Sequence, residues 1–441
     1  MSITESPYEQ HQEGQQIYEL VVRLFPICRS ITGNGVRQTF QIIQEYIPDL
    51  VTYEIPSGTR CFDWVIPDEW NIRDAYIMDK EGKKIINFQE NNLHVVGYSV
   101  PINQEMEFDE LQEHLFSLPD MPDAIPYITS YFKPFWGFCI TKRQREQFKR
   151  QRYQVVIDSE LSHGSLTYAD LLIPGKSSKE VFISTYTCHP SMANNELSGP
   201  TLGTFLAKWV QSRDNFYSYR FVFAPETIGP LVYLSSHLKH LRKNTIAAFN
   251  LTCVGDDRAV SFLSSRKGNT LTDKLARHVL KHKAPGYCDY NFMKNRGSDE
   301  RQYCSPGVDL PMISIMASKY GSYPEYHTSK DDLSVVSPAG FQTTFDLHRE
   351  CFTLLEANRV YGSTIVGEPQ LSRRGLDAEF GGGTTISMMR KLVIDFLACC
   401  DGTTDLITIA DEMSVYGGDL LPVVELLLKH ELIREAKPIT S

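Results

Sequence analysis

The segment 181–187 constrains the fold of this chain more than any other, because it is a run of β-branched and aromatic residues that ends directly before Cys188 and His189. A continuous run of this kind is typical of a strand that is buried in a parallel sheet. In open α/β sheets, ligands bind just beyond the carboxyl ends of such strands. His189 is therefore expected at the mouth of a binding site.

A second histidine, His327, has a similar setting far along the chain. It lies in a polar loop after the apolar run 311–317, and acidic residues lie close in sequence to both histidines. Zinc prefers histidine nitrogen together with at least one carboxylate, and a catalytic zinc site keeps one position open for water. The two histidines therefore suggest a metal site assembled from distant segments.

From about residue 131 onward, expected strands alternate with expected helices, which is typical of an α/β fold with a mainly parallel sheet flanked by helices. The expected strands are 153–158, 181–187, 219–224, 245–253, 259–263 and 312–317. The expected helices are 199–211, 231–241, 271–282 and 341–360.

Two further regions do not show this alternation of strands and helices. Residues 58–128 are mostly short β-rich segments separated by turns, which predicts a small β-rich domain inserted into a larger domain of residues 1–57 and 129–385. Residues 386–441 follow a glycine-rich joint at 379–384 and contain three helical patterns and a closing strand. This spacing is typical of a winged helix-turn-helix.

Charge limits the partners that this chain can bind. The net charge is −10, whereas nucleic acids and anionic membranes select basic surfaces. Residues 386–441 contain five Lys or Arg and nine Asp or Glu, so we expect this domain to dock or to form a homo-oligomer rather than to bind DNA. No apolar run reaches the roughly 18 residues of a membrane span.

Cysteine usage and the first residues favour a cytoplasmic protein. The ten cysteines show no paired CxxC pattern, which is typical of reduced thiols in a core. Cys188 should point to the opposite face of its strand from His189, which argues against a nucleophile there. Residues 1–15 are polar and lack the apolar stretch of a secretory signal.

Four motifs resemble those of the co-catalytic zinc aminopeptidases. They are Cys-His-Pro-Ser-Met-Ala-Asn at 188–194, Ala-Pro-Glu-Thr-Ile-Gly at 224–229, Gly-Ser-Asp-Glu-Arg-Gln at 297–302 and Tyr-His-Thr at 326–328. More narrowly, essentially the whole chain resembles bacterial aminopeptidase-like proteins that occur with surface-polysaccharide biosynthesis genes and add a nested domain and a C-terminal winged helix. The resemblance implies a zinc-aminopeptidase-like fold and hydrolysis of an amide or peptide bond.

The resemblance also implies roles for three residues. His189 and His327 correspond to the two zinc-binding histidines of the family. Glu226 corresponds to the general base, which takes a proton from the attacking water and must lie close to the metal. A glutamate at the start of a helix is also favoured by the helix dipole alone, so a purely structural Glu226 remains the alternative.

Most of the family's acidic metal ligands are missing from this chain. The bridging Asp falls at Asn195, the second Glu at Thr227, the late-strand Asp at Thr252, and the Asp two places after the first His at Ser191. Two adjacent zinc ions need anionic ligands to offset their charge. We therefore expect one zinc ion, held by His189, His327 and either Glu226 or Glu196. Glu196 could equally be an ordinary residue in the first turn of a helix.

Substrate contacts are implied by the same resemblance. Asp299 could accept a free amino group, Arg301 could bind a carboxylate in a bidentate pair, and Tyr326 would contact the substrate. Ordinary surface charges are the alternative for Asp299 and Arg301. Asp331, after His327, could support the site from outside the ligand set or be an ordinary solvated loop acid, and its motif favours the first.

Two functions follow as hypotheses. One is a zinc-dependent hydrolase that acts on a small peptide or on an N-acylated sugar, the latter suggested by the genomic company of the narrower family. The other is a catalytically degenerate aminopeptidase fold that serves in binding or assembly, which the four lost acids would explain.

Overall fold

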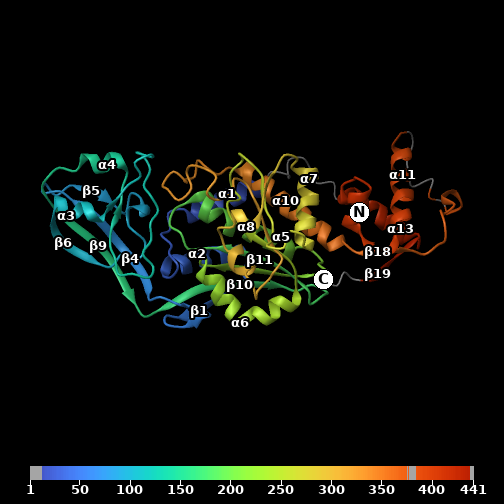
Figure 1. Cartoon of the computed structure of the whole chain (residues 1–441), viewed down its shortest axis with the longest axis horizontal. Helices are drawn as coiled ribbons and strands as arrows, with labels where there is room; N and C mark the ends of the chain where they lie inside the picture. The colour runs from blue at the N-terminus through green and yellow to red at the C-terminus, as the bar shows by residue number, and fades with distance from the viewer. Residues whose placement is uncertain (1–11, 375, 377–383, 438–441) are drawn as a thin grey trace. The chain divides into compact units, whose positions relative to one another are not determined.

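The computed structural model describes residues 12–374, 376 and 384–437 (Figure 1). The chain forms two compact units, one comprising residues up to Gly268 with Cys288–Phe345, and the other Asn269–Tyr287 with residues from Asp346 on. Residues 1–11, and 379–383 of the predicted joint, lie outside the described residues. Over the described ranges, no helix combines the length and apolar character needed to cross a membrane.

A mixed eight-stranded sheet forms the centre of the first unit, in the order β1-β10-β12-β11-β13-β16-β14-β15. Its strands are β1 (Val51–Pro56), β10 (Ser165–Ile173), β11 (Glu180–Tyr186), β12 (Ser218–Ala224), β13 (Thr245–Leu251), β14 (Ser261–Leu263), β15 (Cys288–Tyr290) and β16 (Met312–Met316). The central strands β12, β11, β13 and β16 are parallel, whereas β1, β10 and β14 join antiparallel neighbours. The predicted α/β architecture with a mainly parallel mixed sheet is confirmed.

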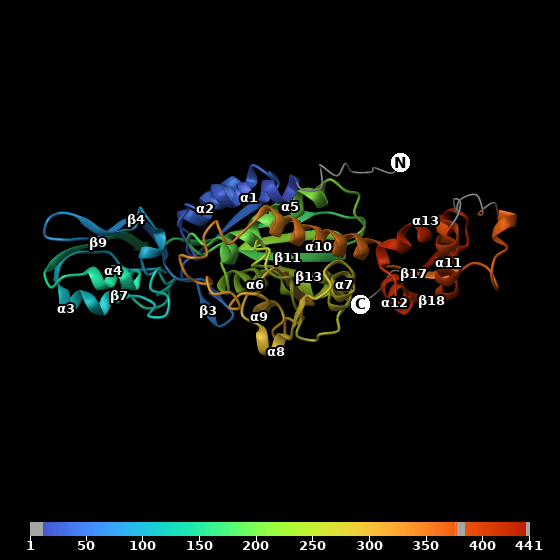
Figure 2. The same ribbon diagram turned by 90° about the horizontal axis from the view of Figure 1, so that it is seen from above.

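Helices cover both faces of this sheet (Figure 2). On one face lie α1 (Gln12–Leu24), α2 (Asn34–Gln44) and α5 (Ser198–Gln211); on the other lie α6 (Ile228–Asn244), α8 (Phe292–Asn295) and α9 (Glu300–Tyr303). Helix α1 shows why they pack this way, since its buried residues Ile17, Leu20, Val21 and Leu24 recur at helical spacing. A long helix, α10 (Pro338–Ala357), begins in the first unit.

The parallel strands place the predicted site residues at one edge of the sheet. Strand β11 ends at Tyr186, which pairs with Ala224 at the end of β12, so His189 and Glu226 follow neighbouring strand ends. The loop that carries His327 follows β16, and Tyr127 donates a backbone hydrogen bond to the His327 carbonyl at 3.0 Å. Three distant segments therefore meet at the edge where ligands bind in such folds.

A smaller lobe is inserted into the first unit. Its antiparallel sheet has the order β5-β4-β9-β6, with β4 (Glu69–Met78), β5 (Lys84–Asn87), β6 (Ile102–Glu107) and β9 (Arg152–Ser162). Short elements accompany it: the pair β7 (Leu115–Phe116) and β8 (Phe138–Cys139), and helices α3 (Phe108–Leu111) and α4 (Lys142–Gln147). The hairpin β2 (Arg60–Cys61) and β3 (Trp64–Val65) precedes the lobe and packs in the core of the large sheet.

The strand predicted at 153–158 belongs to this lobe, and its expected place in the large sheet is wrong. Its alternate residues Tyr153, Val155 and Ile157 are buried in the lobe's own core, while β9 pairs with β4 and β6. We therefore place the limits of the inserted lobe at the ends of its sheet, residues 69 and 162, in place of the expected 58 and 128.

The second unit contains the winged helix. A three-stranded sheet of order β18-β17-β19 combines β17 (Val360–Ser363), β18 (Asp401–Asp405) and β19 (Ile433–Lys437). Helices of this unit are α7 (Leu271–Lys283), α11 (Thr384–Cys399), α12 (Leu406–Glu412) and α13 (Leu421–Lys429). Because β17 pairs with both other strands, we move the start of this module from the expected residue 386 to residue 360.

Candidate functional site

A pocket of about 230 Å³ opens where β11, β12 and the loop after β16 meet. One wall carries the polar residues His189, Glu226, Thr227 and His327. The sequence-predicted metal and catalytic residues His189, Glu226 and His327 thus share one cavity.

A buried carboxylate, that of Glu196, orients the ring of His189. Its Nδ1 donates to a carboxylate oxygen of Glu196 at 2.8 Å, and its Nε2 lies 3.6 Å from Glu226 Oε2. Burial lowers the pKa of His189, but the hydrogen bond and charge of Glu196 offset this, and the pKa is raised overall. Since Nδ1 is held by Glu196, Nε2 is the nitrogen left for chemistry in the pocket.

Glu196 lies behind His189 and does not line the pocket. It belongs to a π-helical turn, Ala193–Leu197, and its side chain is fully buried. Its other oxygen accepts from the Cys188 backbone N–H at 2.8 Å and lies 3.3 Å from Arg29 Nε. In place of the metal-ligand role expected as one option, these contacts favour an orienting role, in which an outer carboxylate fixes the tautomer of a ligating histidine.

Arg29 lies next to Glu196 and completes this series of buried contacts. The sequence had assigned no role to it. Its guanidinium donates to the carbonyl oxygens of His189 and Leu24, each at 3.0 Å. Cys188 Sγ, His189 Nδ1 and Glu196 lie within 4.8 Å of one another and could in principle surround an ion. An ion there would have to displace the Nδ1 proton directly beside the Arg29 cation, which is electrostatically unfavourable.

His327 offers a buried nitrogen without a partner. Its Nε2 makes no hydrogen bond, its ring centroid lies 5.6 Å from that of His189, and it stacks on Tyr326 at 4.0 Å. Its φ of 57° is uncommon for a residue other than glycine. Burial and the nearby His189 lower its pKa to about 3, so the ring is neutral, as a metal ligand must be.

Glu226 lies in a strained turn at the end of β12. The next residue, Thr227, has a φ of 67°, a strained conformation for a β-branched residue. Asp299 holds this turn, because its Oδ1 accepts from the Thr227 N–H at 2.7 Å. Burial raises the pKa of Glu226, and its side chain retains 21% exposure toward the pocket.

The predicted substrate contacts occupy different places around this turn. Asp299 is fully buried and does not line the pocket, so a role in binding a substrate amine has no support in the geometry. Arg301 is exposed and donates to Thr227 Oγ1 at 3.0 Å. Tyr326 packs on His327.

Asn195, at the family's bridging position, has a buried side chain whose Oδ1 and Nδ2 both lack hydrogen-bond partners. Its turn is anchored by Asp331, which accepts from the backbone N–H groups of Asn194 and Asn195 at 2.7 and 2.9 Å. Burial raises the pKa of Asp331 to about 6. Asp331 therefore holds the turn that carries Asn195.

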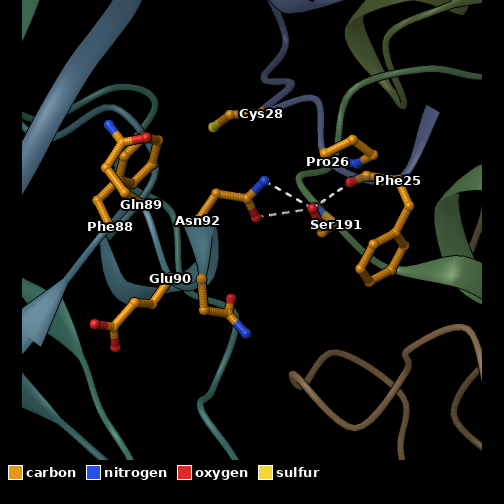
Figure 3. Close-up of a pocket in the computed structure, with 9 residues that line it drawn as sticks. Phe25, Pro26, Cys28, Phe88, Gln89, Glu90, Asn92 and Ser191 are labelled. Atoms are coloured by element: carbon orange, nitrogen blue, oxygen red, sulfur yellow. Dashed lines mark hydrogen bonds between the residues drawn. The ribbon is translucent and has the colours of Figure 1, made fainter. Parts of the chain in front are cut away.

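Ser191 replaces a family acid and is held by the inserted lobe (Figure 3). Asn92 Nδ2 donates to Ser191 Oγ at 2.7 Å, and the Ser191 N–H donates to Asn92 Oδ1 at 3.2 Å. Ser191 thus ties two parts of the first unit together, while Glu196 supplies the orienting carboxylate.

The pocket residues are of the kind that hold zinc. His189 and His327 both line this cavity, and the Nε2 of His327 has no hydrogen-bond partner, so two histidines of the kind that zinc prefers are brought together there. Neutral residues stand at 195, 227 and 252, where the resemblance described above would have acids.

The orienting role of Glu196 can be tested with Glu196→Gln. We expect zinc affinity to fall by about 10- to 100-fold, because an amide orients the ring less strongly than a carboxylate. Competition with a chromophoric chelator measures this change. Glu81→Gln, which alters an exposed acid of the inserted lobe, should bind zinc like the wild type. If Glu196→Gln binds zinc as tightly as the wild type, Glu196 does not have the orienting role.

Comparisons with known proteins agree with this architecture. Residues 18–358 match a family described as a domain of unknown function, DUF4910, and residues 359–435 match a winged helix-turn-helix family. A Clostridium acetobutylicum protein with the provisional name of polysaccharide biosynthesis protein with aminopeptidase-like domain is 43% identical over 426 residues, covering 94% of this chain and 96% of the relative.

Solved structures extend the comparison. A crystal structure of a provisionally named peptidase from Clostridium acetobutylicum has a TM-score of 0.91 at 40% identity, covering 97% of this chain and 98% of the other. A zinc aminopeptidase from Bacillus subtilis has a TM-score of 0.56 at 13% identity, covering 77% and 93%, a likeness that concerns the fold. The predicted resemblance is confirmed: the chain belongs to the DUF4910 family, with an aminopeptidase-like domain followed by a C-terminal winged helix-turn-helix.

Proposed function

We propose that this protein is a zinc-dependent hydrolase that cleaves an amide or peptide bond with one metal ion. The observation that carries the proposal is the unpartnered, buried Nε2 of His327, which shares a pocket with His189 and Glu226. His189 and His327 would hold the ion. When bound, zinc would polarise a carbonyl group and lower the pKa of water.

Glu226 is proposed as the general base and not as a ligand. Its carboxylate is partly exposed to the pocket, and burial raises its pKa, which makes the carboxylate a stronger base. Glu226 would remove a proton from the attacking water and deliver it to the leaving amine. Asp299 and the Thr227 turn would keep the carboxylate in place for both transfers.

The substrate is proposed to be a small peptide or an N-acylated sugar. The name of the Clostridium acetobutylicum relative, which refers to polysaccharide biosynthesis, supports the second class. A cytoplasmic location, and the absence of nucleic acid among its partners, stay predictions from composition and charge.

Metal removal tests the proposal. We expect zinc-loaded protein to release amine from members of an amide panel, the metal-free protein to release none, and equimolar zinc to restore the rate. The rates would be compared with those of buffer that contains the same zinc. Equal rates with and without metal would contradict zinc dependence, and no turnover by the zinc-loaded chain would favour the binding or assembly role.

A further inference from the structure

Aromatic residues make up much of the remaining lining of the pocket. Trp64 comes from the β2–β3 hairpin, whereas Tyr127, Tyr131 and Phe132 come from the segment after residue 126. Trp64 and Phe132 meet edge to face with centroids 5.7 Å apart, and Phe132 is 58% exposed. Tyr127 extends this aromatic lining to His189, with centroids 5.0 Å apart.

The pocket has almost no charge with which to hold an ionic substrate. Among the described residues, its lining includes one carboxylate, Glu226, and no lysine or arginine. The Tyr127 and Tyr131 hydroxyls bond to each other at 2.9 Å. Asp299 is buried behind the Thr227 turn, and Arg301 is exposed and bound to Ser298 and Thr227, so neither belongs to the lining.

The aromatic lining and the scarcity of charge favour one kind of amide substrate over another. A peptide with a free amino terminus brings an ammonium group next to the scissile carbonyl, and a buried ammonium needs a carboxylate other than the base. An N-acyl group brings no charge, and its carrier can stack on an aromatic surface. The chemistry of the walls matches the second kind.

We propose that the pocket selects N-acylated compounds whose acyl end is uncharged, with the ring or chain that bears the amide resting on Trp64 and Phe132. This specificity rests on the proposed hydrolase function. In the reaction, the oxygen of water bonds to the acyl carbon and the carbon–nitrogen bond breaks. The products are a carboxylic acid and an amine, which takes the proton that Glu226 had received.

Binding of two uncleavable ketones to the zinc-loaded full chain tests this selectivity. Benzylacetone is the counterpart of N-acetylbenzylamine, with a CH2 in place of the amide nitrogen, and its amino derivative on the methyl carbon is the counterpart of glycylbenzylamide. Calorimetry should show that the neutral ketone binds at least about tenfold more tightly, because the second ketone buries an unpaired ammonium. An amino ketone that binds as tightly, or failure of both to bind, would overturn the proposal.

Variants locate the binding surface. Trp64→Ala and Phe132→Ala should each weaken benzylacetone binding by about five- to tenfold, since each removes an aromatic contact. Phe62→Ala is the matched control, because Phe62 lies in the connection between β2 and β3, is 48% exposed and does not line the pocket. Equal effects of all three variants, or none, would contradict the assigned surface.

Turnover assays separate this inference from the hydrolase function. Amine release from an N-acetylhexosamine and from an N-acetylated amino acid distinguishes the sugar and peptide sources of the same N-acyl chemistry. Ketone selectivity without any turnover would leave the pocket assignment intact and sink the hydrolase. Turnover of free-amino peptides but of no N-acyl compound would support the hydrolase function and contradict the proposed selectivity of the pocket.

Discussion

Glu226→Gln is expected to lower kcat by about 10²- to 10⁴-fold while the chain still binds zinc, because a positioned general base contributes a factor of this size. Glutamine has nearly the shape of glutamate but cannot accept the proton of the attacking water. The Glu226 backbone N–H, which donates to Cys188 Sγ at 3.2 Å, is untouched by the change. Steady-state rates at saturating zinc, with elemental analysis of the same samples, measure both properties.

The matched control is Glu90→Gln, an exposed acid of the inserted lobe that does not line this pocket. It should leave both rate and zinc content unchanged. Loss of zinc together with activity in Glu226→Gln would show that Glu226 is a ligand and not the base. Full activity with zinc bound would place the base elsewhere.

Arg29→Met is expected to destabilise the fold by about 3–5 kcal/mol, which is the cost of leaving a buried ionic partner unpaired. Arg29 and Glu196 are both fully buried, and burial lowers the pKa of Arg29 against the attraction of Glu196. Methionine fills much of the space but leaves the Glu196 carboxylate and the His189 carbonyl without the guanidinium. Urea denaturation of the full chain, followed at the transition of the first unit, measures the loss.

Two comparisons make this result specific to the buried pair. Arg23→Met removes an exposed arginine that pairs with Glu45 and should cost far less stability, because solvent screens an exposed ion pair. The double variant Arg29→Met with Glu196→Gln should recover part of the loss, since no charge then remains unpaired. If Arg29→Met costs as little stability as Arg23→Met, the buried pair of Arg29 and Glu196 does not stabilise the fold as argued.

The strand ends that carry His189 and Glu226 could be predicted because their signal is local. Each follows a short run rich in β-branched and aromatic residues, and neighbouring parallel strands end at the same edge of a sheet. The position of Glu196 could not be predicted in this way. It lies in a π-helical turn, where one extra residue changes the direction of the side chains, and this turn places Glu196 against His189 Nδ1.

Long-range pairing explains the other differences. The alternation at Tyr153, Val155 and Ile157 suits either sheet, and only the distant partners β4 and β6 decide between them. The aromatic lining likewise joins Trp64 to Phe132, which are far apart in the chain and show no shared periodicity. Arg29 lies outside the four motifs, so no signal in the sequence assigned it a role.

Zinc content tests the central claim most directly. Wild type, His189→Ala and His327→Ala would be purified without chelator or added zinc and subjected to elemental analysis, with a zinc titration of each apoprotein. The single-ion site predicts about one zinc per chain in the wild type and loss of that zinc in both variants. Two zinc ions per chain, or none in the wild type even after titration, would contradict it.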